Sequence, residues 1–239
     1  MTKLSSLLTE KTPKYELKIP STDKTVTYRP FLVKEEKILL IAQESQDNGE
    51  ILLAIRDIVE SCVDGLTDVD DMPIFDIEYI FLRIRSKSVG EVVNPTIVCP
   101  ETQESIELEI DLLSVEPSKE ENHTTNIQIS DDILVKMRYP SLGLLRKRNS
   151  MLDINDSASF YDLIVDCIDE VHTEREVVKS KEISKSEVES FVDAMNKSQF
   201  NSLLEFFLTS PRIEYTTKYT TKDGVERSIT LSGLGDFFG

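Results

Sequence analysis

The chain has 239 residues, of which 39% are hydrophobic and 30% charged, so it is long enough to bury one large core or two small ones. Its 44 Asp and Glu residues outnumber its 27 Lys and Arg residues, and the net charge of −17 at pH 7 disfavours nucleic acid and anionic membranes as partners. Since no stretch approaches the roughly 18 apolar residues of a membrane span and no signal-peptide core is visible, we expect a cytoplasmic protein.

The first predicted element is a β-hairpin over residues 14–29. Apolar and polar residues alternate in both arms, as they do in half-buried strands, and residues 20–23 have the composition of a turn. A helix is predicted over about residues 33–45.

The strongest helix signal of the first half is an apolar stripe with a period of 3.6 residues. Its members are Ile51, Leu52, Ile55, Ile58, Val59, Cys62 and Val63. Gly65 is a candidate C-cap for this helix, and residues 70–73 open another, with carboxylates and a proline suited to a first turn. A second hairpin, with arms over 93–99 and 106–110, completes a first unit that we place at residues 13–113.

Residues 114–125 are polar, contain a proline and show no period, which is typical of a linker. The order of elements then starts again. The predicted elements are a hairpin over 127–139, a helix from 160 to 171, an extra helix over 184–195, a helix over 200–207, and a hairpin over 213–231 that turns at Asp223-Gly224.

The repeated order predicts an α+β fold of two pseudo-repeated units, each a hairpin, two or three helices and a hairpin. Residues 57–64 match residues 162–169 closely, with Cys62 opposite Cys167. The second unit is placed at residues 126–239 and includes an apolar C-terminal tail.

The three cysteines are expected to be reduced thiols. Cys62 and Cys167 hold equivalent places on apolar stripes, which favours core packing over thiol catalysis. Cys99 stands at a hairpin tip, where a zinc ribbon would carry a cysteine pair, but no second cysteine lies within four residues. We therefore expect no metal site.

Other chemistry is equally sparse. His123 falls in the predicted linker, where we expect it to be solvated, and His172 is expected in the last turn of a helix, where a cation is mildly stabilising. With eight glycines, the chain has no phosphate-binding loop or dinucleotide fingerprint. These patterns predict a protein that is not an enzyme, with no cofactor and no small-molecule substrate.

Two features are candidate partner-binding sites. The basic cluster Arg146, Lys147 and Arg148 is flanked by apolar residues in an acidic chain, and is either a contact patch for an acidic partner or an exposed helix end. Phe237 and Phe238 near the C-terminus need to be buried, either on the protein's own hairpin or in a groove of another subunit.

The motifs Ile19-Pro20-Ser21-Thr22 and Tyr28-Arg29-Pro30-Phe31-Leu32, within residues 15–45, resemble the opening of the baseplate hub assembly family of T-even-type contractile-tailed bacteriophages. Residues 209–213 and 231–239 extend the resemblance over nearly the whole chain. It implies a role in tail baseplate hub assembly in the host cytoplasm, with other baseplate hub proteins as partners. The chain would act as a chaperone-like assembly factor or as a hub subunit of the virion tail.

The resemblance supplies no catalytic residues. The alternative is a hub-associated enzyme, such as a cell-wall hydrolase of unfamiliar type. Such an enzyme normally shows a carboxylate or histidine constellation in a cleft rich in glycine and aromatic residues, and this chain has no Trp.

Overall fold

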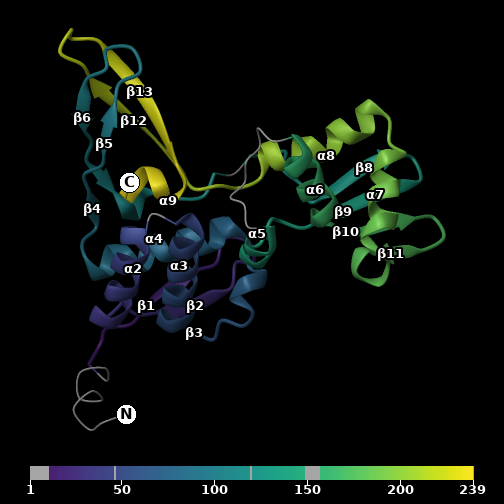
Figure 1. Ribbon diagram of the computed structural model, residues 1–239, viewed down its shortest axis with the longest axis horizontal. Coiled ribbons are helices and arrows are strands. Elements are labelled where there is room, and N and C mark those ends of the chain that lie inside the picture. Colours follow the sequence, from purple (N-terminus) through teal and green to yellow (C-terminus); the bar gives the residue numbers. More distant parts are fainter. Residues whose placement is uncertain (1–10, 46, 119, 149–156, 239) are drawn as a thin grey trace. The chain divides into compact units, whose positions relative to one another are not determined.

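The computed structural model describes residues 11–45, 47–118, 120–148 and 157–238 (Figure 1). The α+β fold class is confirmed. The chain divides into two compact units: unit 1 contains Met1–Ser118 and Arg212–Gly239, and unit 2 contains Lys119–Pro211. Unit 2 is therefore an insertion within unit 1, whereas the sequence pattern predicted a second unit that runs from residue 126 to residue 239.

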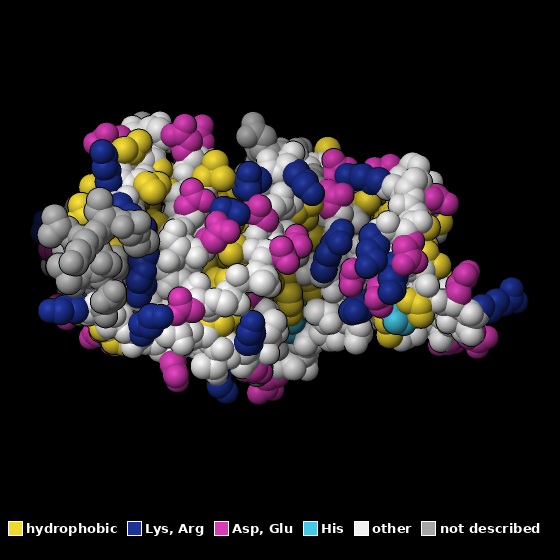
Figure 2. Space-filling model, turned by 90° about the horizontal axis from the view of Figure 1, so that it is seen from below, with side chains coloured by type: hydrophobic (Ala, Val, Ile, Leu, Met, Phe, Trp, Pro, Cys, Tyr) yellow, Lys and Arg dark blue, Asp and Glu magenta, His cyan; other side chains and the backbone are white. Residues whose placement is uncertain are grey.

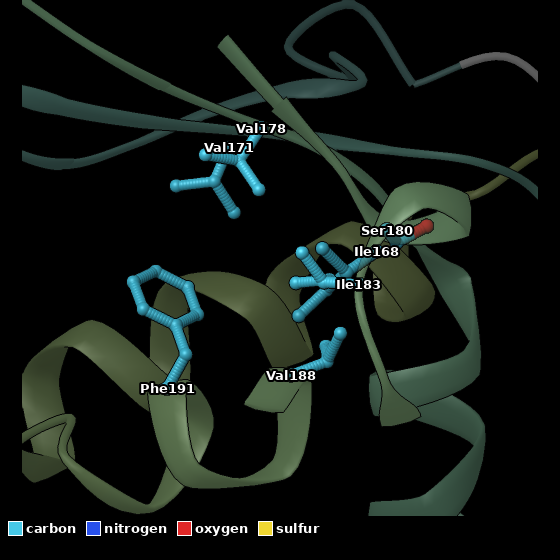
Figure 3. A pocket seen from close by; sticks show the side chains of 7 residues that line it. All are labelled: Ile168, Val171, Val178, Ser180, Ile183, Val188 and Phe191. Carbon is cyan, nitrogen blue, oxygen red and sulfur yellow. The ribbon is translucent and has the colours of Figure 1, made fainter. Parts of the chain in front are cut away.

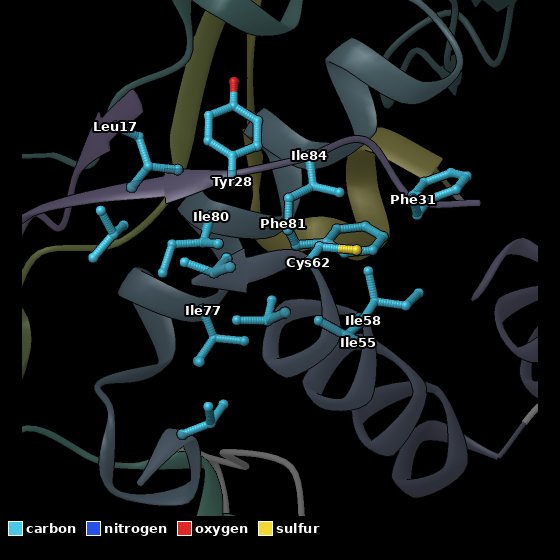
Figure 4. Close-up of a cluster of buried hydrophobic side chains, with 14 of the residues drawn as sticks. Leu17, Tyr28, Phe31, Ile55, Ile58, Cys62, Ile77, Ile80, Phe81 and Ile84 are labelled. Atoms are coloured by element: carbon cyan, nitrogen blue, oxygen red, sulfur yellow. The ribbon is translucent and has the colours of Figure 1, made fainter. Parts of the chain in front are cut away.

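Unit 1 begins with β1 (Tyr15–Lys18) and β2 (Thr25–Tyr28), which form the predicted hairpin. Three helices follow: α2 (Val33–Ser45), α3 (Asn48–Cys62) and α4 (Ile74–Ser88), the last preceded by the 3-10 turn η1 (Val69–Asp71). The strands and helices share one apolar core, shown in Figure 4, in which Ile58, Ile80 and Ile84 are fully buried. Apolar residues at helical spacing on α3 and α4 produce this core.

Helix α3 ends at Cys62 and not at the predicted C-cap, Gly65. Val63 begins β3 (Val63–Asp64), which pairs with β2 and completes the sheet β1-β2-β3. The backbone N–H of Arg29 donates to the carbonyl oxygen of Cys62 at 2.9 Å, so the end of the helix is held by the hairpin. Gly65, with φ of 76°, lies in the turn after β3.

The remaining elements of unit 1 form a second apolar core. They are β4 (Val92–Val93), β5 (Thr96–Val98), β6 (Ser105–Glu107), β7 (Ile110–Asp111), η2 (Leu112–Ser114), β12 (Glu214–Thr220), β13 (Glu226–Ser232) and α9 (Gly233–Phe238). Hairpin β5–β6 packs on hairpin β12–β13, and the teal and yellow arrows lie together in Figure 1. Because this contact buries Ile213, Tyr219 and Leu231, the last hairpin belongs to unit 1.

Unit 2 is a four-stranded antiparallel sheet, in the order β11-β10-β9-β8, covered by helices. Its elements are β8 (Asn126–Ser130), β9 (Ile133–Met137), α5 (Leu142–Arg148), α6 (Ser157–Cys167), β10 (Ile168–Thr173), β11 (Val177–Lys179), η3 (Ser180–Glu182), α7 (Lys185–Asp193) and α8 (Lys197–Thr209). Ser184 and Glu187 form a capping box at the start of α7, the extra helix predicted over residues 184–195.

The predicted helix over residues 160–171 is wrong in its last four residues. The helix ends at Cys167, and Ile168 starts the central strand β10, which pairs with β9 and β11. The apolar residues at this junction fit a helical stripe and an alternating strand equally well. Pairing with β9, about thirty residues earlier in the chain, decides for the strand.

The two connections between the units run side by side. Ser118 donates its backbone N–H to the carbonyl oxygen of Arg212 at 2.8 Å, and the backbone N–H of Arg212 donates to Ser118 Oγ at 3.1 Å. Pro117 and Ile213 form a β-bridge next to them. The chain thus leaves unit 1 and re-enters it at one point.

The duplication remains a prediction, although the units share one local arrangement. Arg138 donates its backbone N–H to the carbonyl oxygen of Cys167 at 2.8 Å, as Arg29 does to that of Cys62. In each unit a strand follows the cysteine and pairs with the second arm of the hairpin. Beyond this point the units differ, since unit 2 continues with α7 and α8.

Candidate functional site

The C-terminal tail forms helix α9, which packs against α4 and β13. Gly233 has φ of 68°, a left-handed conformation that glycine adopts readily, and it turns the chain from β13 into the helix. The carboxylate of Asp236 accepts the backbone N–H of Ser232 at 2.8 Å. The tail is therefore an ordered element of unit 1.

Phe237 is 2% exposed and lies in the second core of unit 1. Phe238 is partly buried: its ring meets the edge of Phe81 at a centroid distance of 6.1 Å, and the guanidinium of Arg85 lies 5.2 Å from its centre. Of the two alternatives for Phe237 and Phe238, burial in the protein itself is the one seen in the structure, since both side chains pack within unit 1. A partner protein could contact Phe237 only if α9 first detached from α4 and β13.

Two carboxyl groups of α4, the buried Asp76 and the half-buried Glu78, have raised pKa values. Burial raises the pKa of Glu78 to about 7, although the side chain accepts a hydrogen bond from the backbone of Leu234. Burial also raises the pKa of Asp76 to about 6, while its carboxylate accepts the backbone N–H of Ser21 at 3.0 Å and the Ser21 hydroxyl. Perturbed carboxyls often mark functional sites. Here each has a partner within the fold, and Asp76 is fully buried.

The basic cluster belongs to helix α5 in unit 2. Leu142 and Leu145 point into the protein, and Arg146 and Lys147 are exposed. Arg148 is the last residue of the helix, and its side chain lies outside the described part. The cluster and the diphenylalanine pair thus belong to different units.

Unit 2 contains an apolar pocket of about 140 Å³, which lies between strands β10 and β11 and helix α7 (Figure 3). It is lined by Ile168, Val171, Val178, Ser180, Ile183, Val188 and Phe191. Pockets for drug-sized ligands usually measure about 300–1,000 Å³ and present several converging polar groups. This pocket is smaller and almost entirely apolar. The pocket was not predicted from the sequence because residues 168–171 fit a helical stripe as well as a strand.

Both histidines differ from expectation. His123 is half-buried: its ring stacks on Tyr139 and also contacts Phe206, and its nitrogens lie 2.9 Å from the Thr209 and Tyr139 hydroxyls. Burial lowers the pKa of His123. His172 lies in strand β10, where its Nε2 is 2.8 Å from the carboxylate of Glu170. Both histidines therefore have structural partners within unit 2.

The three cysteines are buried and form no disulfide. Cys62 lies in the first apolar core of unit 1 and Cys167 in the apolar core of unit 2, as predicted, and burial raises the pKa of Cys62 to about 11. Cys99 Sγ accepts a hydrogen bond from the Tyr219 hydroxyl at 3.4 Å, which joins hairpin β5–β6 to hairpin β12–β13. Nearby, Arg227 pairs with Glu101 at 2.9 Å and with Asp223 at 3.0 Å. The hairpin tips are thus fixed to each other.

On the face shown in Figure 2, Lys and Arg side chains lie among Asp and Glu side chains. Within the described residues, no group of three or more His, Cys, Asp or Glu side chains is arranged to hold a metal ion. In the same part of the chain, no helix has both the length and the apolar character needed to cross a membrane.

Comparison with known proteins gives the family. The "Baseplate hub assembly protein gp26" of Enterobacteria phage T4 is 21% identical over 226 residues, which cover 94% of this chain and 97% of that protein. No solved structure matches the chain significantly. The family described as "T4 bacteriophage base plate protein" matches residues 12–239, which is nearly the whole chain. The resemblance noted in the sequence is confirmed, and the chain belongs to the family of T4 bacteriophage base plate proteins.

Proposed function

We propose that the protein is a non-enzymatic component of tail baseplate hub assembly that acts through contacts with other baseplate hub proteins. The observation that carries this proposal is the match to the T4 hub assembly protein, which extends over almost the full length of both chains. A match of this extent includes both units, and so favours a shared role of the whole protein over a borrowed domain.

The chemistry of the described residues supports action by binding. Asp76 and Glu78, whose pKa values are strongly raised, accept hydrogen bonds from backbone or side-chain groups of the same unit. His123 packs against aromatic rings, and His172 pairs with Glu170. The pocket of unit 2 has an apolar wall with one hydroxyl, from Ser180. General acid–base catalysis needs a titratable group within reach of a substrate. The alternative, a hub-associated cell-wall hydrolase, therefore finds little support.

Within the proposed function, the protein is either an assembly factor that leaves the finished particle or a permanent hub subunit. It would meet its partners in the host cytoplasm while the baseplate is built. Among surface groups, we propose Arg146 and Lys147 of the basic cluster as contacts to an acidic partner, since both are exposed cations in a protein of net charge −17.

Quantitative mass spectrometry of purified virions and of infected-cell lysate separates these two variants. Peptides at a fixed ratio to known baseplate proteins in virions would show a hub subunit, whereas peptides in the lysate alone would show an assembly factor. An affinity pull-down from the same lysate identifies the partners. If it captured no baseplate protein, and the purified protein degraded cell walls, the enzyme alternative would replace this proposal.

A further inference from the structure

Helix α2 (Val33–Ser45) has an unusual outward face. Its inward residues are Glu35 and Ala42, both buried, with Leu39 partly buried beside them. The opposite side exposes Val33 at 79%, Leu40 at 53% and Ile41 at 55%. A surface helix normally presents charged and polar side chains to water, so this face is an apolar patch.

Two charged residues bracket the apolar centre of this face. Lys37 precedes Leu40 by three positions and Glu44 follows Leu40 by four, which places all of them on one side of the helix. Both Lys37 and Glu44 are exposed, and neither forms an ion pair with any other residue that the structure describes. By contrast, the neighbouring Lys34 is paired with Glu35 at 3.1 Å.

We infer that this face is self-complementary and binds a second copy of the same chain, with the two α2 helices antiparallel. A two-fold axis that crosses the helix between Leu40 and Ile41 places Leu40 of one copy against Ile41 of the other. The same axis brings Lys37 of each copy opposite Glu44 of its partner. Two-fold interfaces require one patch to match itself in this way.

The charges select this arrangement over the parallel one. Parallel helices in register would bring Lys37 against Lys37 and Glu44 against Glu44, and like charges in contact oppose association. The antiparallel pair converts all four charges into two ion pairs that flank an apolar centre. An apolar core with a polar rim is the usual anatomy of a protein interface.

The patch involves one helix per subunit, and each subunit carries a net charge of −17, so we expect a weak dimer with a Kd in the micromolar range. At physiological ionic strength the screening length is about 8 Å, which reduces the long-range repulsion while ion pairs in contact persist. The fraction of chains in such a dimer would rise with the concentration of the protein.

The test is analytical ultracentrifugation of the full chain over a wide concentration range, with charge-reversal variants. Wild type is expected to pass from monomer to dimer. Lys37→Glu and Glu44→Lys are each expected to weaken the dimer at least tenfold, because each brings two like-charged pairs together. The double variant K37E/E44K is expected to restore wild-type association, since both ion pairs re-form with reversed sign.

A matched control is the reversal of an exposed pair that lies elsewhere, Lys218→Glu with Glu226→Lys, which should leave self-association unchanged. Circular dichroism and the unfolding midpoint of each variant verify that the fold is intact. A wild-type chain that stays monomeric at every concentration would overturn the proposal and leave the face to a different partner. Dimerisation that persists in both single variants, or that the double variant fails to restore, would also overturn it.

Discussion

The guanidinium of Arg29 donates from Nη2 to the carboxylate of Glu35 at 2.8 Å, and both side chains are largely buried. The same nitrogen donates to the carbonyl oxygen of Ser61 at 3.0 Å, and the other carboxylate oxygen of Glu35 accepts the backbone N–H of Leu32 at 2.8 Å. One ion pair therefore joins the end of the first hairpin, the start of α2 and the last turn of α3.

Glu35→Ala should lower the free energy of unfolding by about 3 kcal/mol at neutral pH, because it leaves Arg29 without its buried partner. Glu36→Ala, one residue along on the exposed side, is the matched control and should change stability by less than about 0.5 kcal/mol. Urea denaturation measures both variants. Equal small effects would show that the pair contributes little.

The same pair gives stability a defined pH dependence. Burial alone would raise the pKa of Glu35, but hydrogen bonds from Arg29, Leu32 and Lys34 outweigh it and lower the pKa. A folded pKa below the unfolded one gives stability that is present above the unfolded pKa and is lost as the pH falls through the folded pKa. The difference between wild type and E35A should therefore shrink in acid.

The pH dependence of stability that comes from Glu78 should be opposite to that from Glu35. The Glu78 pKa of about 7 in the folded protein lies above the unfolded value, so its contribution to stability is present in mild acid and is lost as the pH rises through about 7. Glu78→Gln should stabilise the protein by up to about 3 kcal/mol above neutral pH and have little effect near pH 4. Urea titrations across this range would contradict the prediction if the two unfolding curves stayed parallel.

Phe237→Ala should destabilise unit 1 by about 3–5 kcal/mol, since it empties a site in a packed core. Leu208→Ala removes an exposed side chain in unit 2 and serves as the control, with a change below about 0.5 kcal/mol. Thermal and urea unfolding measure the effect. Loss of a baseplate partner at unchanged stability would instead show that the tail docks on that partner.

Reversal of the charges in the basic cluster should weaken the capture of a partner protein without loss of stability. Arg146→Glu with Lys147→Glu is expected to reduce the recovery of an acidic baseplate partner severalfold in a pull-down, because exposed charges mainly steer association. Arg175→Glu with Lys181→Glu changes two exposed cations of the same unit by the same total charge and is the control. Equal recovery of the partner with both double variants would show that the basic cluster is not a specific contact.

Unit 1 should survive removal of unit 2. Ser118 and Arg212 are hydrogen-bonded to each other, so a linker of about four Gly and Ser residues in place of residues 119–211 closes the gap at little entropic cost. The shortened chain is expected to unfold cooperatively, with α9 still packed. Its far-UV circular dichroism and urea transition measure this, and a chain without a cooperative transition would show that unit 1 depends on unit 2.

Local pattern was enough to predict much of the secondary structure. The alternation in residues 14–29 and the stripe on α3 each involve neighbours in sequence, and so does the pattern of α7. Where the outcome depends on distant residues, prediction failed. Ile168 and Val171 fit a helix or a strand, and pairing with β9 decides for the strand. The assignment of the last hairpin depends likewise on Cys99 and Leu108, more than a hundred residues earlier.

The candidate site shows the same division. The sequence singled out Phe237 and Phe238 as side chains that require burial, but only the fold brings Phe81 and Arg85 next to Phe238. His123 was expected in water because its own segment is polar, while Tyr139 and Phe206 come from other elements. The outward face of α2 could be found from sequence only by knowing which side Glu35 and Ala42 occupy.

The insertion of unit 2 between residues 118 and 212 also fixes an order in time. A ribosome makes residues 119–211 before β12, β13 and α9, so unit 2 can fold while the second core of unit 1 still lacks those elements. Although unit 1 contains the earliest residues of the chain, it is the last to be completed. Until residues 212–239 emerge, the apolar side chains of β5 and β6 have no partner hairpin, and a nascent chain is most vulnerable to aggregation in that interval.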